Sequence, residues 1–362
     1  MKSRLLDVMG DALTLVRKSN LTEATALIRD ALSGREAQRG TPTYPAGARP
    51  PSGRGPLGDV LQALRAGRAH MPKLTPEEEP RRPPDAKLTS RSYSGAAGVL
   101  NYRLYVPSDP ARRGALILML HGCTQDPDDF AVGTRMNALA DEFGFIVAYP
   151  HQPRSANAQG CWNWFDKRHQ HRGSGEPAKL AGLAKSLDSE FGVPRERTFV
   201  AGLSAGGAMA EVLAATYPDV FEAVGVHSGL PYGAANNVMS ALAAMKGTAA
   251  PPAPPDASEM SVRKIVFHGG ADATVHPANG ERIHDQSRLA AKSLKDVDLE
   301  WEVEGRRVSR KILEDAEGHP VHEHWFVEGG EHAWFGGDPS GTYTQSVGLD
   351  ASRLMARFFL ED

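Results

Sequence analysis

A serine flanked by small residues is the strongest chemical signal in the sequence. Ser204 is the centre of Gly202–Gly206, which reads GLSAG and lies between apolar Thr198–Ala201 and alanine-rich Ala205–Thr216. This pattern predicts a strand, a sharp turn and a helix, with the hydroxyl exposed above a sheet edge. A glycine-rich turn that only packs a helix is the alternative. We interpret Ser204 as a nucleophile.

A serine hydroxyl is a weak nucleophile, so it needs a base to take its proton and an acid to orient that base. Where this serine turn occurs, the acid and then the histidine follow along the chain. Asp272 follows the apolar segment Lys264–His268 and is the predicted acid, with an ordinary turn aspartate as the alternative. His332 follows His324–Val327 on a glycine-flanked loop and is the predicted base.

Other histidines compete with His332. The spacing of His319, His322 and His324 is compatible with a metal site, but no carboxylate or cysteine cluster accompanies them. Alternation along a strand explains His322 and His324 equally well. His276, close to Asp272, is interpreted as a pocket or surface residue. We expect no metal and no cofactor.

Acyl transfer also needs hydrogen-bond donors that stabilise the tetrahedral oxyanion. One donor is expected from the backbone N–H of Ala205, directly after the nucleophile. The other is expected from the loop after an early central strand. The apolar segment Ala115–Leu120 predicts that strand, and the backbone N–H of Cys123 is the predicted second donor.

The elements that position these residues alternate between strand and helix from about residue 92 onward. Apolar runs predict buried strands, and three-to-four spacing predicts helices. The pattern implies an α/β fold with a mainly parallel sheet covered by helices on both faces. An Ala/Pro-rich segment between Val238 and Ser261 is expected to be a loop. The predicted strands are Tyr102–Val106, Ala115–Leu120, Phe145–Tyr149, Thr198–Ala201, Ala223–His227, Lys264–His268, Leu299–Val303 and His324–Val327, and the helices Arg135–Phe143, Pro177–Phe191, Ala205–Thr216, Glu281–Lys295 and Val347–Phe359.

Three segments differ in composition. Residues 1–34 show amphipathic spacing and predict a helical hairpin extension. Two roles suit this hairpin: docking on the catalytic domain, or binding a polymer surface or partner. Residues 35–91 are rich in Pro and Gly and predict a largely disordered linker. Residues 92–362 form the predicted catalytic domain.

Composition excludes several classes of protein. The chain has 41 Lys plus Arg and 44 Asp plus Glu, a net charge of -3, which argues against nucleic-acid binding driven by a basic surface. Two cysteines exclude a disulfide scaffold and a four-cysteine zinc site. No apolar run is long enough for a transmembrane segment. Asp7 and Asp11 interrupt the region where a signal peptide would be apolar, which favours a cytoplasmic location.

Four motifs in order carry a resemblance to a known family. They are His121–Gln125, Cys161–Phe165, Gly202–Gly207 and His332–Trp334, which read HGCTQ, CWNWF, GLSAGG and HAW. From about residue 92 to the C-terminus, the chain resembles the polyhydroxybutyrate depolymerase family of esterases. That group is similar to feruloyl and acetyl xylan esterases with an α/β-hydrolase fold.

The resemblance implies a Ser–Asp–His triad at Ser204, Asp272 and His332. It also implies that Cys123 and Cys161 form a disulfide beside the oxyanion hole, with two free thiols as the alternative. The resemblance implies a secreted protein, whereas this sequence shows no signal peptide and no appended substrate-binding domain. The compartment therefore stays open between the two.

Aromatic residues gather in sequence around the expected catalytic loops. With few charges among them, they suit an apolar acyl group or an aromatic ring, and ordinary packing is the alternative. The predicted pocket residues are Trp162, Asn163, Trp164, Tyr232 and Trp334.

The sequence therefore predicts a serine esterase that forms an acyl-enzyme. Its expected substrates are polyhydroxybutyrate, related short-chain polyhydroxyalkanoates, or small acyl or feruloyl esters. The alternatives are a serine peptidase of the same fold and a non-catalytic interaction protein on this fold.

Overall fold

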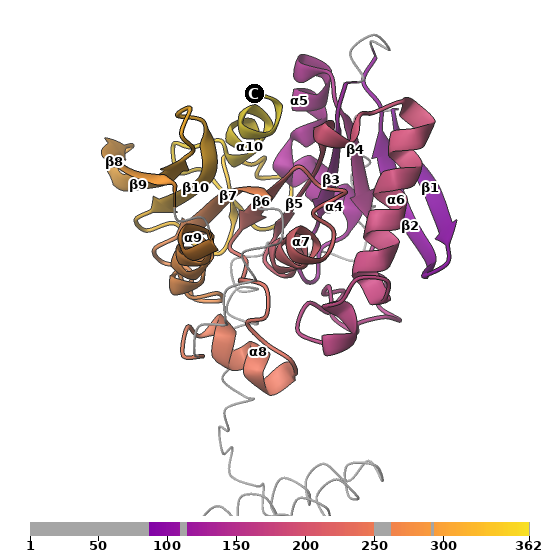
Figure 1. The fold of residues 1–362 in the computed structure, drawn as a ribbon, viewed down its shortest axis with the longest axis horizontal. Coiled ribbons are helices and arrows are strands. Elements are labelled where there is room, and N and C mark those ends of the chain that lie inside the picture. Colours follow the sequence, from indigo (N-terminus) through magenta and orange to yellow (C-terminus); the bar gives the residue numbers. More distant parts are fainter. Residues whose placement is uncertain (1–86, 109–113, 250–261, 291–292, 362) are drawn as a thin grey trace, which may run out of the picture. The chain divides into compact units, whose positions relative to one another are not determined.

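The computed structural model describes residues 87–108, 114–249, 262–290 and 293–361 (Figure 1). Within these residues, one sheet has ten strands in the order β1-β2-β4-β3-β5-β6-β7-β10-β9-β8. Its strands are β1 (Leu88–Gly95), β2 (Gly98–Tyr105), β3 (Leu116–Leu120), β4 (Ile146–Pro150), β5 (Thr198–Leu203), β6 (Ala223–His227), β7 (Arg263–Gly269), β8 (Lys295–Val303), β9 (Arg306–Glu314) and β10 (Pro320–Val327). A short pair, β11 (Trp334–Phe335) and β12 (Thr344–Gln345), forms a second sheet.

Helices separate successive strands from β3 to β8. They are α4 (Pro127–Thr134), α5 (Met136–Phe143), α6 (Gly175–Phe191), α7 (Ala205–Thr216), α8 (Val238–Met245), α9 (Ala278–Ala290) and α10 (Ala351–Leu360). Two short 3-10 helices, η3 (Lys167–His169) and η4 (Arg195–Arg197), precede α6 and β5.

The centre of the large sheet is parallel. Strands β4, β3, β5, β6, β7 and β10 pair in parallel, whereas β1, β2, β8 and β9 join by antiparallel pairing. All residues of β3, β4, β5 and β6 are buried, as expected for strands covered on both faces. The predicted mainly parallel α/β architecture is therefore confirmed.

Alternate residues of one strand belong to two separate cores. In β3, Leu116, Leu118 and Leu120 pack in the core that includes residues of α6, α7 and α9. Ile117 and Met119 point the other way, into the core that includes residues of α4, α5 and α10. The helices thus form two layers with the sheet between them (Figure 1).

Two expectations differ from the structure. The domain boundary predicted at residue 92 falls inside β1, because this strand is polar and mostly exposed and shows no apolar run. The loop predicted after Val238 begins instead with α8, where Asn237 and Ser240 form a capping box ahead of helix-forming Ala, Leu and Met. The hairpin predicted over residues 1–34 and the linker up to residue 86 lie outside the described residues.

The described residues contain no helix that is long and apolar enough to cross a membrane.

Candidate active site

The parallel strands place four of the predicted site residues at one sheet edge. Ser204 follows β5, Cys123 follows β3, and Asp272 lies in the loop after β7. His332 lies in the loop after β10, which pairs in parallel with β7. Carboxyl ends of parallel strands share one edge, and this edge is where ligands bind in open α/β sheets.

Ser204 occupies a sharp turn between β5 and α7. Its backbone has φ 56° and ψ -116°, outside the regions that most side chains adopt, and its N–H donates to the carbonyl of His227 at 2.8 Å. Gly206 is required two residues later, because a Cβ there would lie 2.0 Å from the carbonyl oxygen of Leu120. The predicted strand–turn–helix geometry around Ser204 is therefore present.

Asp272 and His332 contact each other directly. Asp272 Oδ2 lies 2.8 Å from His332 Nδ1, and Asp272 Oδ1 accepts the backbone N–H groups of Thr274 and Val275 at 2.9 and 2.8 Å. Because the carboxylate accepts, Nδ1 carries the proton and Nε2 has a free lone pair. Burial raises the pKa of Asp272, but the hydrogen bond and charge of His332 outweigh it, so the pKa lies below its ordinary value.

A second imidazole contacts the same carboxylate. His268, fully buried at the end of β7, places Nε2 3.5 Å from Asp272 Oδ2 and 2.8 Å from the carbonyl of Val275. Burial lowers the pKa of His268, although the charge of Asp272 partly opposes this. The neutral ring therefore donates from Nε2 and ties the loop that carries Asp272 to its strand.

Among the described residues, no hydrogen bond joins Ser204 Oγ to His332. Ser204 is 8% exposed and the His332 side chain 12% exposed, so both are largely covered. Catalytic hydrogen bonds of this kind often form fully only when substrate is bound.

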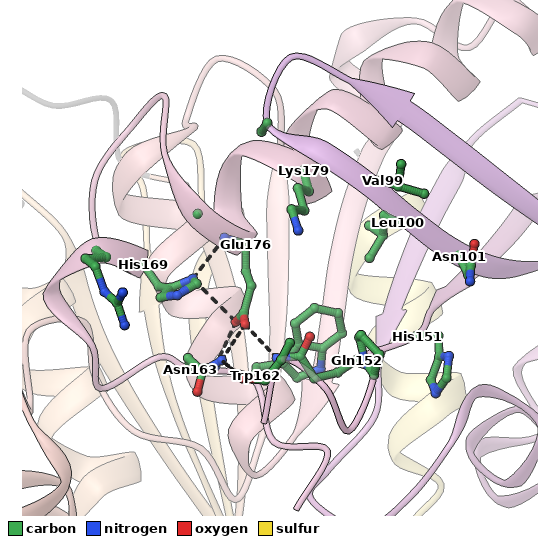
Figure 2. Close-up of a pocket in the computed structure, with 15 residues that line it drawn as sticks. Val99, Leu100, Asn101, His151, Gln152, Trp162, Asn163, His169, Glu176 and Lys179 are labelled. Carbon is green, nitrogen blue, oxygen red and sulfur yellow. Dashed lines mark hydrogen bonds and ion pairs between the residues drawn. The ribbon is translucent and has the colours of Figure 1, made fainter. Parts of the chain in front are cut away.

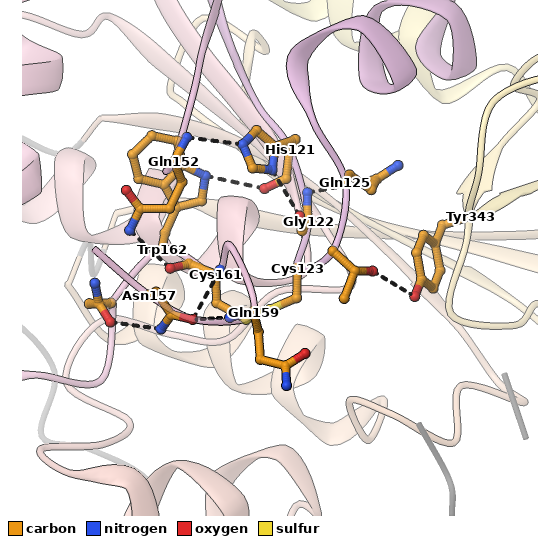
Figure 3. Close-up of a disulfide and its surroundings, with 12 residues drawn as sticks. His121, Gly122, Cys123, Gln125, Gln152, Asn157, Gln159, Cys161, Trp162 and Tyr343 are labelled. Atoms are coloured by element: carbon orange, nitrogen blue, oxygen red, sulfur yellow. Dashed lines mark hydrogen bonds between the residues drawn. A yellow bond between two sulfur atoms is a disulfide. The ribbon is translucent and has the colours of Figure 1, made fainter. Parts of the chain in front are cut away.

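Cys123 and Cys161 form a disulfide with a Cα–Cα distance of 4.3 Å (Figure 3). The pairing implied by the family resemblance is therefore confirmed. Directly after Cys161, the indole N–H of Trp162 donates to the carbonyl of His121 at 3.2 Å. The bridge and this hydrogen bond tie the loop at residues 121–125 to the Trp162 loop, residues 161–165.

His121 anchors the first of these two loops from inside. It is fully buried, its Nε2 accepts the backbone N–H of Gln152 at 3.2 Å, and its Nδ1 lies 2.8 Å from the carbonyl of Gly122. Burial lowers the pKa of His121 to about 4. The ring is therefore neutral near pH 7 and donates from Nδ1 to Gly122.

Glu176 anchors the Trp162 loop from the first turn of α6. Its Oε1 accepts the side-chain amides of Gln152 and Asn163, both at 2.6 Å, and its Oε2 accepts the backbone N–H of Asn163 at 2.7 Å. The carboxylate lies at a helix N-terminus, where negative charge is stabilised. The sequence analysis did not identify this residue.

The predicted pocket residues occupy different environments. Trp162 and Asn163 line a cavity described below. The ring of Trp164 is buried against Phe165, and the Tyr232 hydroxyl donates to the carbonyl of Gln170 at 3.0 Å. Trp334 is 1% exposed and donates from Nε1 to Ser352 Oγ at 2.9 Å, so its ring packs in the core.

The competing histidines take no part in the Asp272–His332 contact. His322 and His324 are buried on β10, and His319 precedes that strand with an exposed side chain. In the described part of the chain, no group of three or more His, Cys, Asp or Glu residues is arranged to hold a metal ion.

Sequence analysis missed two histidines that support the site, His227 and His268. His227 is the last residue of the apolar, buried strand β6, and His268 is the next-to-last residue of β7, whose last five residues are buried. A polar residue at the carboxyl end of a buried strand was the available signal.

Comparison with known proteins shows which family the chain belongs to. The family described as esterase PHB depolymerase matches residues 100–296. Poly(3-hydroxyalkanoate) depolymerase C of Paucimonas lemoignei is 29% identical over 280 residues, which are 72% of this chain and 67% of that protein. A probable acetylxylan esterase A of Aspergillus fumigatus is 30% identical over 203 residues, 51% of this chain and 53% of that protein. The chain thus spans about two thirds of the depolymerase and about half of the acetylxylan esterase.

Among solved structures, an acetyl xylan esterase from Aspergillus awamori superimposes with a TM-score of 0.57 and 20% identity. The match covers 75% of this chain and 98% of that one, and it shows that the fold is an α/β-hydrolase fold. The family match over residues 100–296 contains Ser204, Asp272 and the Cys123–Cys161 bridge. The chain belongs to the esterase PHB depolymerase family of carboxylic ester hydrolases.

Proposed function

We propose that the protein is a serine esterase in which Ser204, His332 and Asp272 act as nucleophile, base and orienting acid. The observation that carries the proposal is the 2.8 Å contact between Asp272 Oδ2 and His332 Nδ1. It fixes the tautomer that leaves His332 Nε2 able to accept a proton. Ser204 supports it by its position in a strained turn at the same sheet edge.

In the proposed reaction, Ser204 Oγ attacks the ester carbonyl carbon while His332 Nε2 takes the hydroxyl proton. The tetrahedral intermediate collapses, the alcohol leaves with the proton from His332, and an acyl-enzyme remains. Water, deprotonated by His332, then attacks the acyl carbonyl and releases the acid. Asp272 stays ionised throughout and stabilises the imidazolium, in keeping with its lowered pKa.

Backbone hydrogen bonding supports Cys123 as one oxyanion donor. In the same loop, Gly122 N–H donates to Gln125 Oε1, Thr124 N–H to the carbonyl of Gln159, and Gln125 N–H to the carbonyl of Gly122. Among the hydrogen bonds of the described residues, Cys123 N–H has no acceptor. It is therefore the N–H of this loop that is available to a developing oxyanion.

Ala205 supplies the second proposed donor. It is the first residue of α7, and the first N–H groups of a helix have no partner inside the helix. The helix N-terminus adds partial positive charge where the oxyanion would form. Loss of one such donor costs roughly a hundredfold or more in kcat.

The proposed substrates are esters of short hydroxy acids, with poly(3-hydroxybutyrate) tested first. The support is the similarity to a protein named poly(3-hydroxyalkanoate) depolymerase C. Acetyl and feruloyl esters come next, because other relatives carry the names acetylxylan esterase and feruloyl esterase.

The test measures acid release from amorphous poly(3-hydroxybutyrate) and from p-nitrophenyl butyrate by the wild type, Ser204→Ala and Asp272→Asn. We expect Ser204→Ala to abolish both activities, and Asp272→Asn to lower kcat by roughly 10³–10⁴-fold because the imidazole loses its orienting acceptor. An organophosphonate probe should label the wild type and not Ser204→Ala. Equal turnover by the wild type and Ser204→Ala would refute the proposal, and comparable hydrolysis of peptide anilides would favour a peptidase.

A further inference from the structure

Two cavities lie at the same sheet edge as Ser204, beside residues 151–153, which follow β4. The first, of about 460 Å³, lies between the start of β2, the end of β4 and the first turns of α6 (Figure 2). The second, of about 410 Å³, contacts the loop that begins at Thr124. Both are lined by His151, Gln152 and Pro153, so the two cavities adjoin across this segment.

The pair of cavities connects with the proposed oxyanion loop. Thr124, which lines the second cavity, directly follows the proposed donor Cys123. Trp162, which forms a wall of the first cavity, is hydrogen-bonded to the carbonyl of His121. A chain bound along these cavities would therefore extend away from the oxyanion hole toward α6.

The one carboxylate of the first cavity is already occupied. Both oxygens of Glu176 accept hydrogen bonds from Gln152 or Asn163, so they are not available to donors of a ligand. In the second cavity, Asp126 Oδ1 accepts two N–H groups of α4. The acidic side chains that line these cavities are therefore engaged in hydrogen bonds within the protein.

An arginine and a lysine line the first cavity, and they differ in their partners. Arg168 is exposed and forms an ion pair with Asp166 at 2.6 Å. Lys179 is half-buried on α6, lines the first cavity, and has no hydrogen-bond or ion-pair partner among the described residues. Its side chain packs beside Gly98 at the start of β2, which limits its freedom. Figure 2 shows the Lys179 side chain pointing from α6 into the space between Leu100 and Asn163. Leu100 and exposed Val99 supply an apolar wall on β2.

We propose that this cavity binds the free carboxylate end of a short linear oligoester of a hydroxy acid, with Lys179 as the partner of the carboxylate. Such a ligand offers carbonyl acceptors, small alkyl branches and one negative charge, and no N–H donors. The apolar wall matches the alkyl branches, and the unpaired ammonium group matches the charge. The substrate class rests on the proposed function, whereas the preference for a carboxylate rests on the cavity.

The test measures binding to Ser204→Ala, so that turnover does not interfere. The ligands are linear 3-hydroxybutyrate trimer and tetramer as free acids and as methyl esters, titrated by calorimetry at low salt. We expect the free acid to bind more tightly than the methyl ester, and Lys179→Met to weaken free-acid binding by about fivefold while affecting the ester little. Added salt should reduce the difference between acid and ester.

Two further variants separate charge from packing. Lys179→Arg retains the charge and should bind the free acid nearly as well. Lys185→Met removes a lysine of the same helix, near Asp219 and outside the cavity, and should change neither binding nor ester turnover. Equal affinity of acid and ester, or equal loss for both in Lys179→Met, would overturn the proposal. Failure of the wild type to hydrolyse p-nitrophenyl butyrate would instead count against the proposed function alone.

Discussion

His227 Nε2 accepts a hydrogen bond of 3.1 Å from the backbone N–H of Phe335, three residues beyond His332 in the chain. The carbonyl of the same His227 accepts the N–H of Ser204 at 2.8 Å. One fully buried residue at the end of β6 thus holds both the nucleophile turn and the loop of the proposed base. Its ring also stacks on Trp334, with centroids 5.1 Å apart.

We expect His227→Phe to lower kcat more than it changes KM. Phenylalanine leaves the buried Phe335 N–H without an acceptor, which costs about 1–3 kcal/mol and allows the His332 loop to shift. His227→Gln provides an oxygen near the position of Nε2 and should recover part of kcat. Kinetics on p-nitrophenyl butyrate and urea unfolding of both variants check this, and an unchanged kcat in a folded His227→Phe would contradict it.

Reduction of the Cys123–Cys161 bridge should lower both stability and kcat. The two cysteines are separated by 38 positions, and a loop of that length contributes about 4 kcal/mol to stability in the chain-entropy estimate. Catalysis should weaken because the bridge holds the loop of the proposed donor Cys123. Unfolding and turnover are measured with and without dithiothreitol.

The double variant Cys123→Ala and Cys161→Ala is the control for that experiment. It should resemble the reduced wild type and should not respond to dithiothreitol. Full activity of the double variant would show that the oxyanion loop keeps its shape without the bridge.

Stability should fall when the pH drops below about 6.5, because of buried histidines between β10 and α9. His284 lies with its ring centroid 4.9 Å from that of His322 and 6.3 Å from that of His324. Burial holds the pKa of His322 and His324 well below the ordinary value, and neighbouring positive charge adds to this. The charged neighbours are Lys264 of β7, Lys311 of β9, Asp285 of α9, and Asp296 and Asp298 of β8.

The direction of this pH effect on stability follows from which state of the chain binds protons. Below about pH 6.5 the unfolded chain protonates these histidines and the folded chain does not, so each lowers the unfolding free energy by about 1.4 kcal/mol per pH unit. Urea unfolding between pH 7.5 and 5.5 measures this slope. His322→Leu should reduce the slope by about one proton, whereas His319→Gln, an exposed control, should leave it unchanged. Equal slopes in all three proteins would refute the prediction.

The parallel strands could be predicted from the sequence, whereas the antiparallel strands β1 and β9 could not. Leu116–Leu120 is apolar throughout because both faces of β3 are covered. In contrast, β9 over Arg306–Glu314 is rich in charged residues, and its antiparallel neighbours on both sides define it as a strand. The predicted helix Glu281–Lys295 likewise ends at Ala290, because Lys295 already pairs with Glu314 in β8.

In the candidate site, too, some residues could be predicted from local sequence and others could not. Ser204, Asp272 and His332 could be predicted because each lies in a short glycine-containing loop directly after a strand. The supporting role of His227 depends on the pairing of β5 with β6 and on a contact with a residue more than a hundred positions away. Local patterns hold no information about such a contact. The Glu176 contacts with the Trp162 loop depend on tertiary folding for the same reason.

The backbone of Ser204, at φ 56° and ψ -116°, carries a further consequence. A non-glycine residue in such a conformation costs on the order of 1–3 kcal/mol, which the surrounding structure must supply. Glycine would relieve this strain and remove the hydroxyl at the same time. Selection for thermal stability alone would therefore favour loss of the serine, and retention of Ser204 places activity and stability in opposition at a single residue.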